Sequence, residues 1–290
     1  MKGCAAKLIT VKKRLSKTKI FWITFAVFIC AVMLICLAMQ IALLCADRIK
    51  CWHPDYERVD LSGILNKSEL TDGDYELIFN QTGLTQIGTD RILARGEDGK
   101  RRLLKIQDDY FAEHKVKGEI YAPLICSDKI DASVTSVYLE DGDIIITSST
   151  HFSGWRIGHA GLVTSGARGE VLQASSYGTE SGTGNIRDFT GRVNFLVLSP
   201  KADDELKSEV VQFALSNLKG KRYSVTAGLF SDKNKINATQ CAHLVWFAYK
   251  KYGIDLDGNG GKLVTPRDVA NSPEVELVQT FGFNPNKLWT

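Results

Sequence analysis

A long apolar run near the start of the chain is the strongest pattern in the sequence. From Ile20 to Ala46 no residue is charged, and only Thr24 and Gln40 are polar. A run of this length is longer than a buried helix of a soluble domain needs, and it suffices to cross a bilayer. The pattern therefore predicts a transmembrane helix over residues 20–46.

The charges on the two sides of this run predict its orientation. Residues 1–19 carry seven Lys or Arg side chains and no acid, whereas only Arg48 and Lys50 follow the run closely. The positive-inside rule then keeps residues 1–19 in the cytoplasm as a basic tail. We expect a single-pass protein of the cell membrane, with everything after residue 46 on the extracytoplasmic side.

Two processing signals would change this topology. A cleaved signal peptide needs a shorter apolar run with small residues before the cut, and a lipoprotein signal ending at Cys45 needs a small residue where Leu44 stands. A retained membrane anchor is therefore the favoured interpretation.

Residues 47–118 are charged and only intermittently apolar. Turn signals stand at Thr71–Asp74 and Glu97–Lys100. The stretches Tyr75–Phe79 and Leu103–Ile106 fit either short helices or strands, and we prefer helices. No recognisable chemistry falls in this region, so we interpret it as a stalk or a small accessory lobe.

The pattern changes after Glu140, where short β-branched runs alternate with turns. Strands are predicted over 144–147, 156–163, 170–174 and 193–198, with a glycine-rich loop at 177–184, and helices over 202–218 and 239–252. Short strands joined by turns favour an antiparallel sheet. We expect an α+β domain over residues 119–290.

Composition excludes several classes of protein. With 44% hydrophobic and 24% charged residues in 290, the chain can build a full core and is neither fibrous nor disordered. The formal charge is +3, but without the seven cations of the tail the remaining residues carry a net charge of −4. A slightly acidic body gives no electrostatic reason to bind nucleic acid.

Three cysteines lie beyond the membrane: Cys51, Cys126 and Cys241. A disulfide between Cys51 and Cys126 would leave Cys241 as the free thiol. Thr239 is a good N-cap for the helix predicted to follow it, which places Cys241 in the first helical turn. The positive end of a helix stabilises a thiolate, so Cys241 is a candidate nucleophile. Alternatively, it is a small buried apolar side chain.

A nucleophilic Cys needs a base, and His159 is the best of the five histidines. A strand would fix its ring, and small neighbours leave it approachable. His243 is disfavoured, because two residues along a helix rotate a side chain by about 200°. Gln173, on the next strand, can orient the imidazole through its amide oxygen. The alternative is a structural His159 without a catalytic role.

A family resemblance enters at these residues. Gly220-Lys-Arg-Tyr223, Gln240-Cys-Ala-His243 and Lys251-Tyr-Gly-Ile254 resemble the nucleophile half of NlpC-type papain-like peptidases. Gly158-His-Ala-Gly-Leu-Val163 looks like the family's histidine strand, yet it precedes the cysteine here. This order, with Gly142-Asp-Ile-Ile145 before it, is similar to the circularly permuted branch that includes the YiiX-like proteins and the lecithin:retinol acyltransferase relatives. The resemblance covers roughly residues 140–270.

The resemblance implies a permuted papain-like fold in which Cys241 is the nucleophile, His159 the base and then acid, and Gln173 the orienting group. It also implies that Tyr223 helps to bind the oxyanion beside the Cys241 N–H. The chain departs from the family where Gln240 and Ala242 replace the usual Asp and Ser. Gln173 also stands where the permuted branch often has Glu.

No metal site and no cofactor are expected. Asp255-Leu-Asp-Gly-Asn-Gly260 matches the start of an EF-hand loop, but Pro266 occupies the position of the bidentate Glu. A turn rich in Asp, Asn and Gly is the better interpretation.

Three functions remain open. The first is a membrane-tethered thiol hydrolase, an amidase or endopeptidase that cleaves cell-wall peptides. The second is a thiol acyltransferase or amidase acting on a lipid-linked amide, which a long apolar groove beside Cys241 would favour. The third is a catalytically silent wall-binding domain, in which Cys241 would react no faster than free cysteine.

Overall fold

The predicted apolar segment forms helix α1 (Lys17–Cys45) in the computed structural model. The structure describes residues 16–45, 50–122, 124–134, 136–152 and 155–289. The stretch Lys17–Ile41 is long and apolar enough to cross a membrane. Residues 1–15 of the expected cytoplasmic tail, and Ala46 at the end of the expected span, lie outside the described residues.

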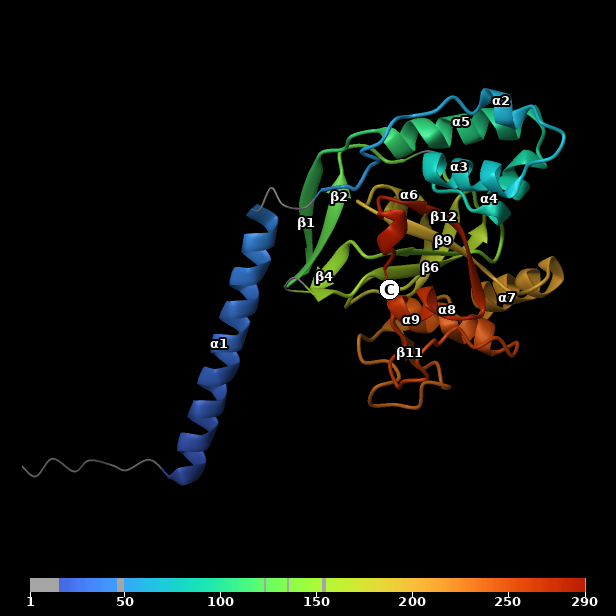
Figure 1. The fold of residues 1–290 in the computed structure, drawn as a ribbon. Helices are drawn as coiled ribbons and strands as arrows, with labels where there is room; N and C mark the ends of the chain where they lie inside the picture. The colour runs from blue at the N-terminus through green and yellow to red at the C-terminus, as the bar shows by residue number, and fades with distance from the viewer. Residues whose placement is uncertain (1–15, 46–49, 123, 135, 153–154, 290) are drawn as a thin grey trace, which may run out of the picture.

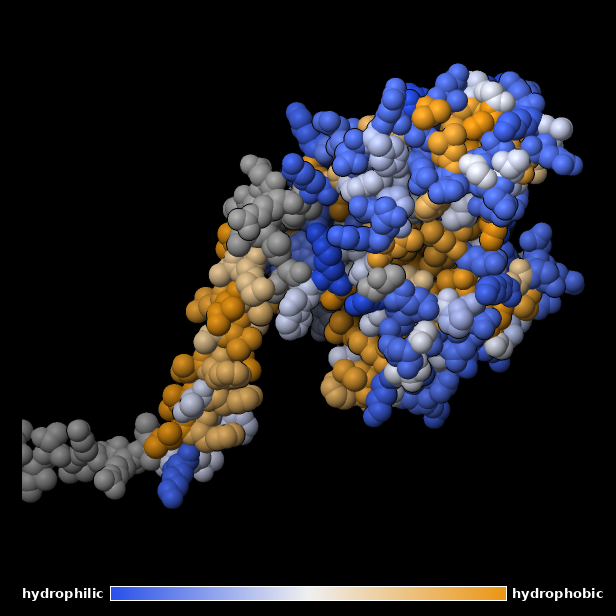
Figure 2. All heavy atoms as spheres, in the orientation of Figure 1, coloured by the Kyte–Doolittle hydropathy of each residue, from blue (hydrophilic) through white to orange (hydrophobic). Residues whose placement is uncertain are grey.

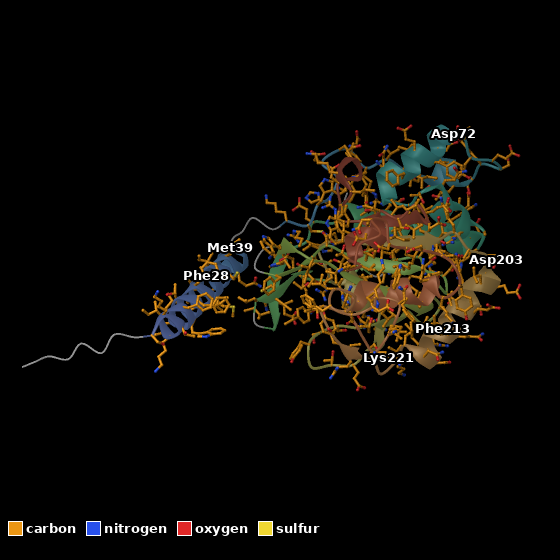
Figure 3. All side chains as sticks on the ribbon, turned by 90° about the horizontal axis from the view of Figure 1, so that it is seen from below. Phe28, Met39, Asp72, Asp203, Phe213 and Lys221 are labelled. Carbon is orange, nitrogen blue, oxygen red and sulfur yellow. The ribbon has the colours of Figure 1, made fainter. Side chains whose placement is uncertain are left out.

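Most of helix α1 stands apart from the rest of the molecule, and its C-terminal end, at Gln40, contacts the folded domain (Figure 1). Figure 2 shows an apolar surface along it, whereas the visible surface of the folded domain is largely hydrophilic. Phe28 and Met39 lie on this helix in Figure 3, which is turned by 90° from Figure 1. Their exposed fractions are 62% and 45%. An apolar helix that no protein surface covers is what a lipid environment accommodates.

A six-stranded antiparallel sheet forms the centre of the domain, in the order β12-β9-β3-β6-β7-β8. The strands are β3 (Ile144–Thr147), β6 (His159–Ser165), β7 (Glu170–Gln173), β8 (Gly182–Asn185), β9 (Phe195–Pro200) and β12 (Val275–Phe281). Every residue of β3, β6 and β9 is buried, so both faces of the sheet are covered. The α+β class with an antiparallel sheet is thus confirmed.

Side chains alternate between two apolar layers across this sheet. Ile144, Ile146 and Ala160 pack in one layer with helices α7 (Asp204–Asn217) and α8 (Cys241–Lys250). Ile145 packs in the other layer, which includes Phe189 and Tyr110. The short helices α6 (Arg187–Thr190) and α9 (Pro266–Ala270), the pair β10 (Arg222–Tyr223) and β11 (Ala238–Thr239), and the turn η1 (Pro285–Lys287) complete this part.

A smaller antiparallel sheet, in the order β1-β2-β4-β5, lies between α1 and the central sheet (Figure 1). Its strands are β1 (Val116–Ala122), β2 (Ile125–Ile130), β4 (Thr150–Phe152) and β5 (Trp155–Arg156). The domain boundary placed at 118/119 falls inside β1. At the end of α1, Gln40 Nε2 donates a hydrogen bond to Cys126 Sγ on β2.

The lead segment is helical, as preferred from the sequence. It contains α2 (Ser62–Leu65), α3 (Asp72–Thr82), α4 (Gln86–Leu93) and α5 (Glu97–Phe111). It packs directly on the central sheet, because Thr85 N donates to Val278 O on β12 and Thr280 N donates to Gly83 O. Arg91 on α4 also forms ion pairs with Glu140 and Asp143, which precede β3.

Several local expectations were wrong. The two expected turns are helix starts: Thr71 caps α3 through a capping box with Asp74, and Glu97 begins α5. The expected strand over 156–163 is interrupted, and the expected glycine-rich loop contains β8. The disulfide that the sequence left open does not form: Cys51 and Cys126 are free thiols, with Cys51 Sγ in contact with Val193 O and Cys126 Sγ in contact with Gln40.

Candidate active site

Cys241 is the first residue of helix α8, as the sequence predicted. Strand β11 leads into the helix, and Gln240 rather than Thr239 is its N-cap: Gln240 Oε1 accepts a hydrogen bond from Ala242 N at 2.8 Å. Thr239 instead bonds to the His243 ring. The Cys241 thiol also donates to Gln240 Oε1, at 3.3 Å. The cap residue thus holds the sulfur at the positive end of the helix.

His159 begins strand β6, and α8 packs against this strand. Its ring stacks on Phe189 of α6, with centroids 5.1 Å apart and planes 13° apart. The backbone N–H of Ala160, the next residue of the strand, is close enough to Cys241 to lower the pKa of its thiol. The histidine strand and the cysteine helix therefore meet at these residues.

The His159 ring is oriented by two further side chains in series. Its Nε2 lies 2.7 Å from Gln173 Oε1, and Gln173 Nε2 donates to Asp188 Oδ2 at 2.6 Å. A carboxylate accepts hydrogen bonds and does not donate them, so Asp188 fixes which end of the Gln173 amide faces the ring. The amide oxygen then requires the proton on Nε2, which leaves Nδ1 as the basic nitrogen.

A glycine makes room for this series. A Cβ at Gly184 on β8 would lie 2.2 Å from Gln173 Nε2 and 2.7 Å from Asp188 Oδ2. Only a residue without a side chain fits there unless the amide and the carboxylate move. The sequence analysis missed Asp188 and the strand β8. The signal that was available is the Gly182-Thr-Gly-Asn185 segment followed closely by an acidic residue.

Burial keeps both reacting groups neutral. It lowers the pKa of His159 to about 4; the hydrogen bond to Gln173 opposes this shift, the charge of Arg192 adds to it, and the charge of Asp188 opposes it. Burial also raises the pKa of the Cys241 thiol. The backbone N–H groups of Ala160, Ala242 and Cys241 lower it and oppose this rise only in part. At neutral pH the site therefore holds a thiol and an uncharged imidazole.

Cys241, His159, Gln173 and Tyr223 all line one cavity of about 480 Å³. Figure 1 shows α8 and α9, two of the elements that line it, close to the C-terminus. Tyr223 on β10 is half-buried beside the cysteine, and burial together with a negative charge on Cys241 raises the pKa of its hydroxyl. A cavity of this volume suits a small molecule or part of a peptide.

The other histidines lie elsewhere within the part of the chain that the structure describes. His243 bonds to Thr239 Oγ1 and Lys233 O and does not line the cavity, as its helical phase predicted. His151 is paired with Asp128 at 3.1 Å. Among the described residues, no group of three or more His, Cys, Asp or Glu side chains is placed to hold a metal ion.

Comparisons with known proteins give one relative and no activity. The uncharacterized protein YycO of Bacillus subtilis (strain 168) is 30% identical over 141 residues, which is 48% of this chain. The match covers 56% of YycO, so the chain spans about half the length of this curated relative. No family model and no solved structure match the chain.

Proposed function

We propose that this chain is a membrane-anchored cysteine hydrolase that cleaves an amide bond in cell-wall peptides on the extracytoplasmic side. The observation that carries the proposal is the meeting of Cys241, at the start of α8, with the series His159–Gln173–Asp188 at one cavity. The Cys241 thiol is hydrogen-bonded to Gln240 in this structure, and a thiol nucleophile beside an imidazole base that an amide orients supplies the parts that acyl transfer requires.

The neutral resting state sets the order of proton movements. Cys241 Sγ bonds to the amide carbonyl carbon as its proton passes to His159 Nδ1. The imidazolium then gives that proton to the leaving amine as the C–N bond breaks, which leaves a thioester on Cys241. A water molecule, deprotonated by the same nitrogen, attacks the thioester and releases the carboxylic acid with the thiol restored.

Each remaining group has a role in this sequence. The Cys241 N–H and the Tyr223 hydroxyl stabilise the tetrahedral oxyanion. Gln173 holds the ring through Nε2 and leaves Nδ1 as the basic nitrogen, and the Asp188 carboxylate offsets the positive charge that the ring acquires. An amide between ring and carboxylate transmits less of that charge than direct contact would, so we expect a modest turnover rate.

The order of elements supports a permuted papain-like fold as part of this proposal. The histidine strand β6 precedes the cysteine helix α8 in the chain. The first strand of the central sheet in chain order is β3, which follows Gly142-Asp143. Catalysis depends on where the side chains meet and not on the order in which the chain visits them.

The test uses the full chain in detergent micelles, incubated with peptides released from purified bacterial cell wall. Mass spectrometry is expected to find pairs of products whose masses add up to one substrate molecule plus one water. Cys241→Ala and His159→Ala must both abolish these products. If wild type forms no products and Cys241 is alkylated no faster than free cysteine at neutral pH, the proposal is wrong.

A lipid-linked amide is the second candidate substrate, because apolar side chains supply much of the cavity wall. They are Ile125, Ile157, Val225, Leu263 and Trp289. The same protein incubated with an N-acyl phospholipid in mixed micelles distinguishes the two. Release of a fatty acid that depends on Cys241, without cleavage of wall peptides, favours this candidate over the first.

A further inference from the structure

A buried arginine on the cavity wall lacks a carboxylate partner. Arg192 is 6% exposed and lines the same cavity as Cys241. Its Nε donates to Asp188 O at 2.8 Å and its Nη1 to Thr150 Oγ1 at 3.2 Å. Within the described ranges, no Asp or Glu oxygen forms an ion pair with it. A guanidinium carries five N–H donors, so these two bonds leave most of its capacity unused.

The described residues around this cation hold it in place without an ion pair: burial lowers the pKa of Arg192, and the charges of nearby acidic groups, Asp188 among them, oppose that shift only in part. The guanidinium lies over the Tyr121 ring, 5.0 Å from its centroid. Arg156, which also lines the cavity, is paired with Asp128 at 2.9 Å and is therefore already compensated. Burying an uncompensated charge costs several kcal/mol, and proteins retain such charges where a ligand completes the pair.

The charge of Arg192 acts at the reacting groups. It lowers the pKa of His159, which places it within electrostatic reach of the imidazole. Besides the paired Arg156, two arginines, Arg192 and Arg267, line the cavity against one acid, Asp188. The cavity therefore favours a negative group on whatever enters it, and a planar guanidinium matches the two oxygens of a carboxylate.

We propose that Arg192 forms a binding subsite for a carboxylate carried by the substrate close to the bond that Cys241 attacks. The proposal rests on the proposed thiol hydrolase and narrows its substrates to acidic ones, such as a peptide with a free carboxyl group near the scissile amide. Arg192 binds and positions this group through its unused N–H donors and takes no part in proton transfer.

Two alkylating reagents of nearly equal size test the charge preference without a known substrate. Iodoacetate is an anion and iodoacetamide is neutral; each forms a thioether with the Cys241 thiolate and releases iodide. Because both react with the same thiolate, the ratio of their rates does not depend on the pKa of Cys241. Peptide mapping by mass spectrometry follows Cys241 separately from the other cysteines of the full chain in neutral detergent micelles.

The rate of iodoacetate relative to iodoacetamide, normalised to free cysteine, is expected to be raised roughly three- to tenfold in the wild type, as one partly screened charge pair allows. Arg192→Gln should abolish this preference, and Arg192→Lys, which keeps the charge, should retain most of it. Arg187→Gln is the matched control, because Arg187 begins α6, which ends shortly before Arg192, but is exposed and does not line the cavity.

The proposal is overturned if the normalised ratio is near one in wild type, or if Arg192→Gln leaves a raised ratio unchanged. Unfolding of a variant is visible separately as rapid alkylation of the buried Cys51 and Cys126 by both reagents. If Arg192→Gln unfolds, the normalised ratio of Arg192→Lys is compared with that of the wild type. A ratio near one in Arg192→Lys also overturns the proposal. Slow alkylation by both reagents argues against the hydrolase, but the ratio still measures the subsite after longer incubation.

Discussion

Replacing His159 by Gln should change how the stability of the protein responds to acid. The unperturbed pKa of His is about 6.5, whereas burial lowers the pKa of His159 to about 4 in the folded chain. The folded state therefore favours the neutral ring, and the unfolded state binds a proton at a higher pH. Gln is uncharged at every pH, so the variant lacks this linkage.

The sign and the size of the change in stability follow from the pKa values of His159 in the folded and unfolded chains. Above pH 6.5 the ring is neutral in both states, so it does not change the free energy of unfolding. As the pH falls from 6.5 to 4, the unfolded chain gains a proton that the folded chain resists, so wild type loses stability over this interval. Below pH 4 the loss stops growing. At 1.36 kcal/mol per pKa unit the full loss is about 3 kcal/mol.

Thermal unfolding of the full chain in detergent micelles, followed by tryptophan fluorescence, measures this loss. A loss of about 3 kcal/mol corresponds to roughly 6–12 °C for a domain of this size. The fall in Tm between pH 7 and pH 4 should be larger for wild type than for His159→Gln by that amount. All other titrating groups are common to both proteins and cancel in the difference.

Gln173→Glu is the informative companion variant. A carboxylate in contact with Nε2 raises the pKa of His159, so this protein should lose less stability than wild type on acidification. Equal falls in Tm for wild type and His159→Gln would refute the reasoning, because they would mean that the ring titrates alike in the folded and unfolded chains.

Three further predictions concern the site and the packing of the lead segment. Cys241→Ala and His159→Ala should each lower amide hydrolysis at least 10³-fold, while Gln173→Ala should lower it roughly tenfold, all measured by mass spectrometry of the products; a fully active His159→Ala protein would contradict the mechanism. Gly184→Ala should reduce hydrolysis by displacing the Gln173 amide, whereas Gly182→Ala on the same strand, where an added Cβ meets nothing within 4 Å, should not; equal rates in the two variants would remove the role of the Gln173–Asp188 contact. Gly88→Ala places a Cβ 2.3 Å from Val278 O and should lower stability by roughly 1–3 kcal/mol in thermal unfolding, while Gly63→Ala, in open space, should not; an unchanged Tm for Gly88→Ala would contradict the tight packing of α4 on β12.

Local patterns predicted the elements whose sequence decides their structure. The stretch Ile144–Thr147 is β-branched and forms β3. Cys241 was placed correctly in a first helical turn, although through an N-cap at Thr239, one residue before the actual cap Gln240. These features depend on neighbours within one or two turns of the chain.

Contacts between distant segments decided the rest. The expected strand over 156–163 breaks at Gly158, whose φ is +70° and whose α-carbon lies against the Trp289 ring from the C-terminus. Strand β8 carries two glycines and exists because it pairs with β7. Asp188 acquires its place in the site only when α6 packs beside that pair, so the glycine-rich segment before it is a signal that could not assign its role alone.

The contact of the lead helices with β12 also constrains how the protein is made. The lead helices follow directly behind α1 in the chain. Their docking surface on the sheet is completed by residues 275–281, which are synthesised long after the lead helices. The lead helices must therefore wait, undocked, until β12 joins the sheet.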